Sequence, residues 1–511
     1  MRKLLSFALG ATIVFATVLI AGTLQTPQPP SAPPPSAPAP PANPDLADET
    51  LLRWPLPPGA EKYAVIDGKR MHRDVVAQAL ISRKYRDQGH PKFWGRIIGT
   101  SSDAESAEWL AGRFRAVGLS EVRIQPFDLA PQWMPQSWEV SVTAAGKTLK
   151  MESAQPNYAS VPTPPGGLDL EGVYVGLGSE ADYVGKNVRG KAVFVFTQVG
   201  LQLGQDWTAL AKRAEEKGAA AYFEVDMLPG NMRYQGYPAN TKTPAFTVGS
   251  GDGFALRDLI AAAPSEAPRV RVALDVKMEP NLKTALVWGS LPGASDETIY
   301  IVAHRDGWFD ASGDNASGVA SMIGLAEYYA KVPRAQRRRT MVFIGLDGHH
   351  NSGEGGASGG KWLAENRDKL FAKTALAINA EHPSTLQTYV RPRYEENRQI
   401  AWSNAYTAQQ WYAGGPSRPE LQAIAVKAFQ EFGVPLIREP NVRPPLGDLG
   451  RLFRFTPGVA TSDFYHYFHT DQETPATVPW TGLEATTRAY ARIVDEVNKL
   501  PLEKLQRPPE S

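Results

Sequence analysis

Two short apolar runs, separated by a helical pattern, constrain the fold of this chain more than any other feature. Residues 298–303 and 340–346 are rich in Ile, Val, Tyr and Phe, as buried β-strands are. Between them, residues 316–330 place apolar side chains at helical spacing, and Asp314 and Asn315 provide a helix-start signal. The order strand, loop, helix, strand predicts a βαβ unit in a mostly parallel sheet, and hence an α/β fold.

Histidine and aspartate side chains gather at the ends of these two predicted strands. His304 and Asp306 follow the first strand, Asp314 lies in the loop, and His349 and His350 follow the second strand. Sites in such sheets form beyond the carboxyl ends of the strands. Imidazole and carboxylate suit zinc, and a second carboxylate such as Asp306 often orients a ligating histidine. The pattern therefore indicates a metal site, although a solitary His or Asp at a strand end is more often a structural group.

Several motifs, in this order along the chain, resemble the family of co-catalytic zinc aminopeptidases and glutamate carboxypeptidases, whose transferrin-receptor relatives share the fold. The resemblance implies an α/β fold with a mostly parallel or mixed central sheet flanked by helices, as in zinc exopeptidases. The motifs are HPKFWGRIIGTSSDAESAEWLAGRFRAVGL at 90–119, HRDGWF at 304–309, SGDNASGVA at 312–320, RRTMVFIGLDG at 338–348, GGASGGKWLAEN at 355–366 and YFHTDQETP at 467–475.

The resemblance also implies a set of metal ligands. In that family one aspartate bridges two zinc ions, and further His and acidic side chains complete each ion. Carried over to this sequence, His304 is the first ligand, Asp314 the bridge and Asp306 the group that orients His304. Glu381 takes the place of the family's acidic ligand and His469 that of the final histidine. We therefore expect zinc, one or two ions per chain.

The chain departs from the family where the family has two consecutive glutamates, the first a general base and the second a zinc ligand. Here the pair is His349 and His350. Imidazole ligates zinc well, so that His350 can keep the ligand's place. A neutral imidazole, with an unperturbed pKa of about 6.5, can accept a proton, and His349 is therefore the expected base. Glu354 is expected in a surface loop, with a role as substitute base left open, and His382 and His466 are expected to line a pocket or to pack.

The N-terminus carries an export pattern. Met1, Arg2 and Lys3 precede the apolar run 4–22, and residues 26–44 are dominated by Pro, Ala and Ser. We expect an exported protein that is periplasmic, secreted or anchored in a membrane by its N-terminal segment. The chain has no cysteine, which excludes disulfides, thiol chemistry and a lipid anchor on cysteine.

The chain, at 511 residues, is long for one domain. The expected division is a signal peptide or N-terminal anchor at 1–25, a Pro-rich linker at 26–59, a metallopeptidase-like domain at 60–165 and 276–505, and a tail at 506–511. Residues 166–275 resemble an inserted protease-associated α/β domain, with strands at 172–175 and 191–197 and a helix leading to Gly218. A generic α/β insertion is the alternative.

These features together predict an exported zinc-dependent exopeptidase, of aminopeptidase or carboxypeptidase type, that hydrolyses peptide or related amide bonds with metal-activated water. Its partners are then peptide or aminoacyl substrates, and a net charge of +1 without a strongly basic block gives no support to nucleic-acid binding. Because His349 and His350 replace two glutamates, a catalytically impaired ectodomain used for binding is the competing hypothesis. Cyclisation of N-terminal glutamine is a third, which the HRDGW pattern and the protease-associated segment disfavour.

Export is testable without any knowledge of the substrate. A reporter enzyme that is active only outside the cytoplasm, fused after Pro44, is expected to be active because the signal-like run carries it across the membrane. A silent reporter on a stably expressed fusion would contradict export, and mass analysis of the mature protein separates a cleaved signal from an anchor.

Overall fold

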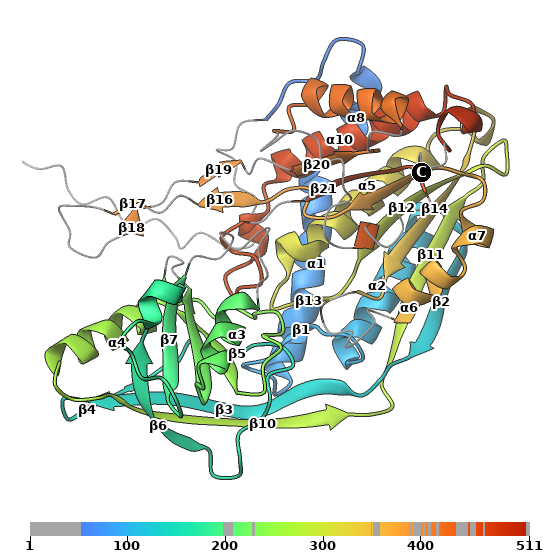
Figure 1. Ribbon diagram of the computed structural model, residues 1–511. Coiled ribbons are helices and arrows are strands. Elements are labelled where there is room, and N and C mark those ends of the chain that lie inside the picture. Colours follow the sequence, from blue (N-terminus) through green and yellow to red (C-terminus); the bar gives the residue numbers. More distant parts are fainter. Residues whose placement is uncertain are drawn as a thin grey trace, which may run out of the picture. The chain divides into compact units, whose positions relative to one another are not determined.

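The computed structural model describes most of the chain from residue 53 onward (Figure 1). The described residues belong to one compact unit, and the residues of the export pattern lie outside the described part of the chain. Among the described residues, no helix is both long and apolar enough to cross a membrane. The described residues are 53–197, 208–226, 230–348, 350, 358–388, 391–392, 400–401, 404–406, 410–414, 418–435, 448–449, 456–462 and 465–506.

A seven-stranded mixed sheet forms the centre, in the strand order β2-β11-β14-β12-β15-β21-β20. Strands β14, β12, β15 and β21 are parallel to one another, whereas β2, β11 and β20 pair antiparallel to their neighbours. The predicted βαβ unit and α/β fold are thereby confirmed. The strands are β2 Ser120–Asp128, β11 Lys283–Leu291, β14 Thr340–Leu346, β12 Thr298–His304, β15 Thr374–Ala380, β21 Gly458–Ser462 and β20 Gln410–Ala413.

Helices cover both faces of this sheet because its strand residues alternate between two apolar cores. Ile299, Ile301 and Ala303 of β12 pack toward one core, and Tyr300 and Val302 toward the other. The first core takes in α1, α2, α5, α8 and α10, and the second takes in α6 and the segment after α7. The helices are α1 Gly68–Asp87, α2 Ser101–Val117, α5 Gly318–Ala330, α6 Ser358–Glu365, α7 Arg367–Leu370, α8 Pro419–Glu431 and α10 Trp480–Val497.

A second, eight-stranded sheet has the order β4-β3-β10-β6-β7-β8-β9-β5 and carries α3 and α4. The expected strands at 172–175 and 191–197 and the helix before Gly218 are present as β6, β7 and α3. The elements are β3 Gln132–Ala144, β4 Lys147–Lys150, β5 Gln155–Pro156, β6 Leu168–Tyr174, β7 Ala192–Thr197, α3 Ala209–Glu216, β8 Ala221–Asp226, β9 Ala245–Gly249, α4 Ser250–Ala262 and β10 Arg269–Glu279.

Two long strands join the two sheets. Figure 1 shows β3 and β10 side by side, and they pair antiparallel from Arg269 with Thr143 to Glu279 with Gln132. Each is a short step along the chain from a strand of the central sheet, β2 for β3 and β11 for β10. The second sheet therefore begins before residue 166, because β3 and β4 complete its edge beside β10. Its identity as a protease-associated domain, with boundaries at 166 and 275, stays a prediction.

The loop after β12 connects the two cores. Trp308, which is 1% exposed, belongs to the same apolar cluster as Phe194 and Phe223 of the second sheet. The short strand β13, Gly307–Trp308, pairs with β1, Gly95–Arg96, next to the first strand-end histidine. The insertion is thus packed directly against the loop that carries the predicted site. The remaining short strands are β16 Leu386–Thr388 with β19 Asn404–Tyr406, and β17 Arg391–Pro392 with β18 Ile400–Ala401.

A buried arginine holds this loop in place. The Arg96 guanidinium donates hydrogen bonds to the backbone oxygens of Arg305 at 2.8 Å, Asp310 at 2.8 Å and Ala311 at 3.0 Å. Burial lowers the pKa of Arg96 to about 10, so that it stays cationic at neutral pH. Because three carbonyl groups of one loop share a single rigid donor, the position of Trp308 within that loop is fixed.

Candidate metal centre

The candidate site lies at the carboxyl ends of the four parallel strands. His304 ends β12, His350 follows β14, Glu381 and His382 directly follow β15, and His469 lies in the segment after β21. Asp314 lies in the π-helical turn Ser312–Ser317 that precedes α5. All six side chains are at most 5% exposed. The ends of adjacent parallel strands meet at one sheet edge, which brings these distant residues together.

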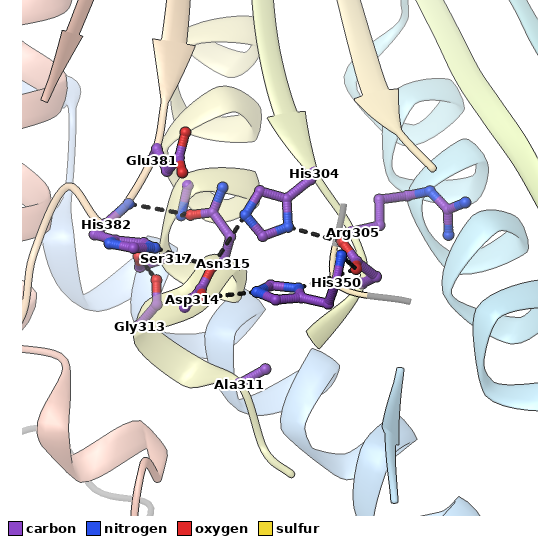
Figure 2. A network of polar contacts seen from close by, with 12 residues as sticks. His304, Arg305, Ala311, Gly313, Asp314, Asn315, Ser317, His350, Glu381 and His382 are labelled. Carbon is purple, nitrogen blue, oxygen red and sulfur yellow. Dashed lines mark hydrogen bonds and ion pairs between the residues drawn. The ribbon is translucent and has the colours of Figure 1, made fainter. Parts of the chain in front are cut away.

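The Asp314 carboxylate is the centre of the cluster (Figure 2). Its Oδ1 lies 3.0 Å from His304 Nε2 and 2.9 Å from His382 Nε2. Its Oδ2 lies 3.0 Å from His350 Nε2 and 2.9 Å from His469 Nε2. Each oxygen of one buried carboxylate therefore faces a pair of imidazole nitrogens.

Asp306 orients two of these imidazoles. Its Oδ1 lies 2.9 Å from His304 Nδ1, and its Oδ2 lies 3.0 Å from His350 Nδ1. The same Oδ2 accepts a hydrogen bond of 2.9 Å from the backbone N–H of His350. If each Nδ1 donates its hydrogen to Asp306, the Nε2 of a neutral ring points a lone pair at Asp314. A lone pair facing a carboxylate is repulsive, so that a cation, either a proton or a metal ion, is required between them.

The donor set fits zinc in both type and spacing. Two ligands that each lie about 2.0 Å from a tetrahedral ion are themselves about 3.3 Å apart. The nitrogen–oxygen distances around Asp314 are close to that value, and the Nε2 atoms of His350 and His469 are 3.0 Å apart. Donor atoms within 4.8 Å of one another form three groups among the described residues: His304, Asp306 and His350; His304, Glu381 and His382; and Asp314, His350 and His469.

Electrostatics in the metal-free cluster favours imidazolium and carboxylate. Burial alone would lower the pKa of His350, but the charges of Asp314 and Asp306 outweigh it and raise the pKa to about 9. The pKa of His304 is likewise raised against the effect of burial by its bonds to the same two carboxylates. Burial would raise the pKa of Asp314, but the neighbouring imidazoles, His382 first, hold it well below its usual range. Protons therefore compete with metal for this cluster.

Glu473 fixes Asp314 relative to His469. Its Oε1 accepts hydrogen bonds of 2.6 Å from the backbone N–H of Asp314 and from the hydroxyl of Tyr465. Its Oε2 accepts a hydrogen bond of 2.9 Å from the backbone N–H of His469. Burial and then the charge of Asp314 raise the pKa of Glu473 to about 8. Glu473 was not predicted as a site residue, although it lies in the motif YFHTDQETP four positions after His469.

The second sheet contributes an aromatic side chain to the site. Tyr237, from the segment between β8 and β9, is half-buried and lies 4.9 Å from His469 and 5.9 Å from Trp308, measured between ring centroids. The neighbouring Gln235 donates its backbone N–H to the carbonyl of His469 at 2.9 Å. Nothing in the sequence indicated this contact, because a segment more than 200 residues away in the chain makes it.

The structure brings most of the predicted site residues together. His304, Asp306, Asp314, His350, Glu381 and His469 lie in one cluster, in which their roles as ligands or orienting groups stay predictions. His349, the predicted base, and Glu354 lie outside the described residues. His382, which we expected to pack or to line a pocket, joins the cluster, whereas His466 belongs to none of the candidate ligand groups.

The raised pKa of His350 predicts how stability depends on pH in chelator-treated protein. A histidine whose pKa rises from 6.5 in the unfolded chain to about 9 in the folded one stabilises the fold fully below pH 6.5. That contribution is lost as the pH rises through 9. The free energy of unfolding in urea is expected to fall by a few kcal/mol over this window, because one pKa unit corresponds to about 1.4 kcal/mol. His350→Gln should make the profile less steep, because the raised pKa values of His304 and Glu473 leave part of the slope in place, and a wild-type profile that is already flat contradicts the assignment.

Comparisons with known proteins agree with this geometry. Residues 287–494 match peptidase family M28. The probable glutamate carboxypeptidase VP8 of Zea mays is 22% identical over 349 residues, covering 56% of this chain and 48% of that protein. The chain thus spans about half the length of this curated relative.

Solved structures share the fold over nearly their whole length. The M28 peptidase precursor from Shewanella amazonensis SB2B superimposes with a TM-score of 0.61 at 18% identity, covering 86% of this chain and 97% of its own. The zinc aminopeptidase BSAP from Bacillus subtilis gives 0.58 at 16% identity, covering 87% and 99%. The aminopeptidase from Aneurinibacillus sp. strain AM-1 gives 0.52 at 18%, covering 88% and 97%. The resemblance found in the sequence motifs is confirmed by this match of residues 287–494 to peptidase family M28, which supports a metallopeptidase.

Proposed function

We propose that this protein is an exported, zinc-dependent exopeptidase that hydrolyses peptide or related amide bonds. One observation carries the proposal: a single buried carboxylate, Asp314, offers each of its two oxygens to a pair of imidazole nitrogens at 2.9–3.0 Å. A structural histidine needs one partner, and four imidazoles converging on one carboxylate are an arrangement that suits two cations. The M28 match over 287–494 supports the same function.

The residues divide into two zinc positions that share Asp314. The first would be held by Asp314 Oδ1, His304 and Glu381, and the second by Asp314 Oδ2, His350 and His469. Zinc bound there supplies a Lewis acid for the scissile carbonyl and lowers the pKa of a water molecule toward neutrality.

The surrounding residues hold the ligands and limit access of water. Asp306 keeps the rings of His304 and His350 in one orientation, and Glu473 does the same for the backbone of Asp314 and His469. Such outer partners are worth about 10- to 100-fold in metal affinity. The rings of Trp308 and Tyr237 pack on the ligating imidazoles and keep them largely out of water. His349, next to His350 in the chain, is the proposed proton acceptor and donor to the leaving amine.

Both types of exopeptidase remain within this proposal. The solved structures with the shared fold include aminopeptidases, and the curated relative is a probable glutamate carboxypeptidase. Export is supported by the positive start, the apolar run and the Pro-rich spacer before residue 45. Turnover of peptides blocked at one end or the other shows from which end of the substrate residues are removed.

Turnover of zinc-loaded protein tests the proposal. We expect the protein to hydrolyse members of a panel of aminoacyl amides and of blocked and unblocked peptides. Activity should be lost on chelation and should return when zinc is added. Below about pH 6 the rate should fall, because protonation of His349 removes the proton acceptor. His349→Ala should lower kcat by about two to four orders of magnitude with metal content unchanged. His466→Ala, an imidazole in the segment of His469 but outside the ligand groups, is the matched control and should turn over normally.

Three outcomes separate the alternatives. No hydrolysis by zinc-loaded wild-type protein supports the impaired ectodomain, in particular if His349→Glu gains activity. Cyclisation of N-terminal glutamine without peptide hydrolysis supports the third hypothesis. An active enzyme whose rate is indifferent to His349→Ala contradicts the role of His349 and directs attention to Glu354.

A further inference from the structure

We propose that His382 is a fourth side-chain ligand of the first zinc position, which it closes, whereas the second position keeps an open place for substrate or water. The first position then has Asp314 Oδ1, His304, Glu381 and His382, and the second has Asp314 Oδ2, His350 and His469. The inference rests on the zinc dependence in the proposed function, but it does not depend on turnover.

The contact of His382 with the bridge is equivalent to those of the expected ligands. Its Nε2 lies 2.9 Å from Asp314 Oδ1, the same oxygen that His304 Nε2 approaches to 3.0 Å. The His350 and His469 pair repeats this arrangement at Oδ2. His382 is 3% exposed, so that its charge or lone pair is not compensated by bulk water.

Glu381 and His382 lie just past the end of β15, and both reach the same place. Ligand atoms of His304, Glu381 and His382 lie within 4.8 Å of one another. The backbone at His382 has a φ of 44°, in the left-handed region, which turns its side chain back toward the cluster. Asn315 holds this turn, because its Oδ1 accepts the N–H of His382 at 3.2 Å (Figure 2). Its Nδ2 donates to the carbonyl of Ala380 at 2.9 Å.

A purely structural ion pair between His382 and Asp314 does not account for the whole cluster. The ring of His382 packs against Tyr465 and Phe468, at 5.8 and 5.5 Å between centroids, and its Nε2 faces the carboxylate. His382 Nε2 approaches the Asp314 carboxylate just as the Nε2 atoms of the three expected histidine ligands do, and a single ion pair gives no reason for four imidazoles to converge on one carboxylate.

Ligand number then assigns different roles to the two positions. Zinc sites closed by four protein ligands are structural, and catalytic sites keep three protein ligands and one open place. The first position would thus anchor the bridge Asp314, and the second would be the one that substrate or water approaches. The aromatic contacts of Tyr237 and Trp308 are with the imidazoles of this second position.

Zinc titration of chelator-stripped full-length protein against a competing chelator tests the ligand role. Wild type should show two binding steps. His382→Ala should weaken one step more than about 100-fold, beyond the loss expected for an outer partner, and leave the other step unchanged. Glu381→Gln should weaken the same step, and His469→Ala the other one. His466→Ala should change neither. His382→Gly provides a second variant, because glycine tolerates the positive φ at this position.

If the His382 variants unfold cooperatively and their zinc affinity falls by less than about 100-fold, the ligand role is overturned. It is also overturned if the His382 variants weaken the same binding step as His469→Ala. These outcomes are independent of hydrolysis: an inactive protein with the expected titration pattern retains the inference and loses the proposed function. Cobalt binding tests the open place. In His382→Ala the cobalt should be held at the second position, and in His469→Ala it should be held at the first. Azide should change the visible spectrum of the former only, and a response confined to the latter overturns the assignment.

Discussion

The confinement of the Asp314 carboxylate among four buried imidazoles is the constraint on which the rest of the site depends. Its two oxygens face nitrogens of His304, His350, His382 and His469 at 2.9–3.0 Å. A buried carboxylate and buried imidazoles each carry a large desolvation cost unless charge and hydrogen bonding compensate them. In the metal-free protein, protons on the imidazoles compensate the charge of the buried carboxylate, and the raised pKa of His350 reflects this. In the holoprotein two divalent ions would do so, and the competition couples metal affinity to pH.

The fold brings segments that are distant in the chain to one edge of the central sheet, and surrounding residues hold them in position. Four parallel strands bring candidate ligands to their carboxyl ends, Arg96 fixes the loop after β12, and Glu473 holds Asp314 and His469 together. The second sheet packs on the same loop through Trp308 and places Tyr237 beside the imidazoles. The second sheet therefore contributes to the surroundings of the candidate site.

The sequence predicted the elements whose signals are local. Residues 298–303 and 340–346 form β12 and β14 almost to the residue, because continuous apolar runs mark strands buried on both faces. The helix expected at 316–330 begins at Gly318, since the preceding turn Ser312–Ser317 is π-helical and contains the non-helical Asp314. The convergence of His304, His350, Glu381 and His469 followed from the family resemblance and from the rule for strand ends.

What the sequence missed depends on backbone detail and long-range packing. Glu381 and His382 lie just past the end of β15, where strand alternation no longer sets the side-chain direction, and the positive φ at His382 cannot be predicted from the sequence. Tyr237 reaches the site through the packing of one sheet on another, for which no local pattern exists.

Anomalous diffraction at the zinc absorption edge, from crystals of zinc-loaded protein, tests the central claim most directly. Two peaks are expected, one beside Asp314 Oδ1 with His304 and His382 in contact, and one beside Oδ2 with His350 and His469 in contact. A single peak, or zinc bound away from Asp314, would contradict the assignment of this carboxylate as the bridge between two metal positions.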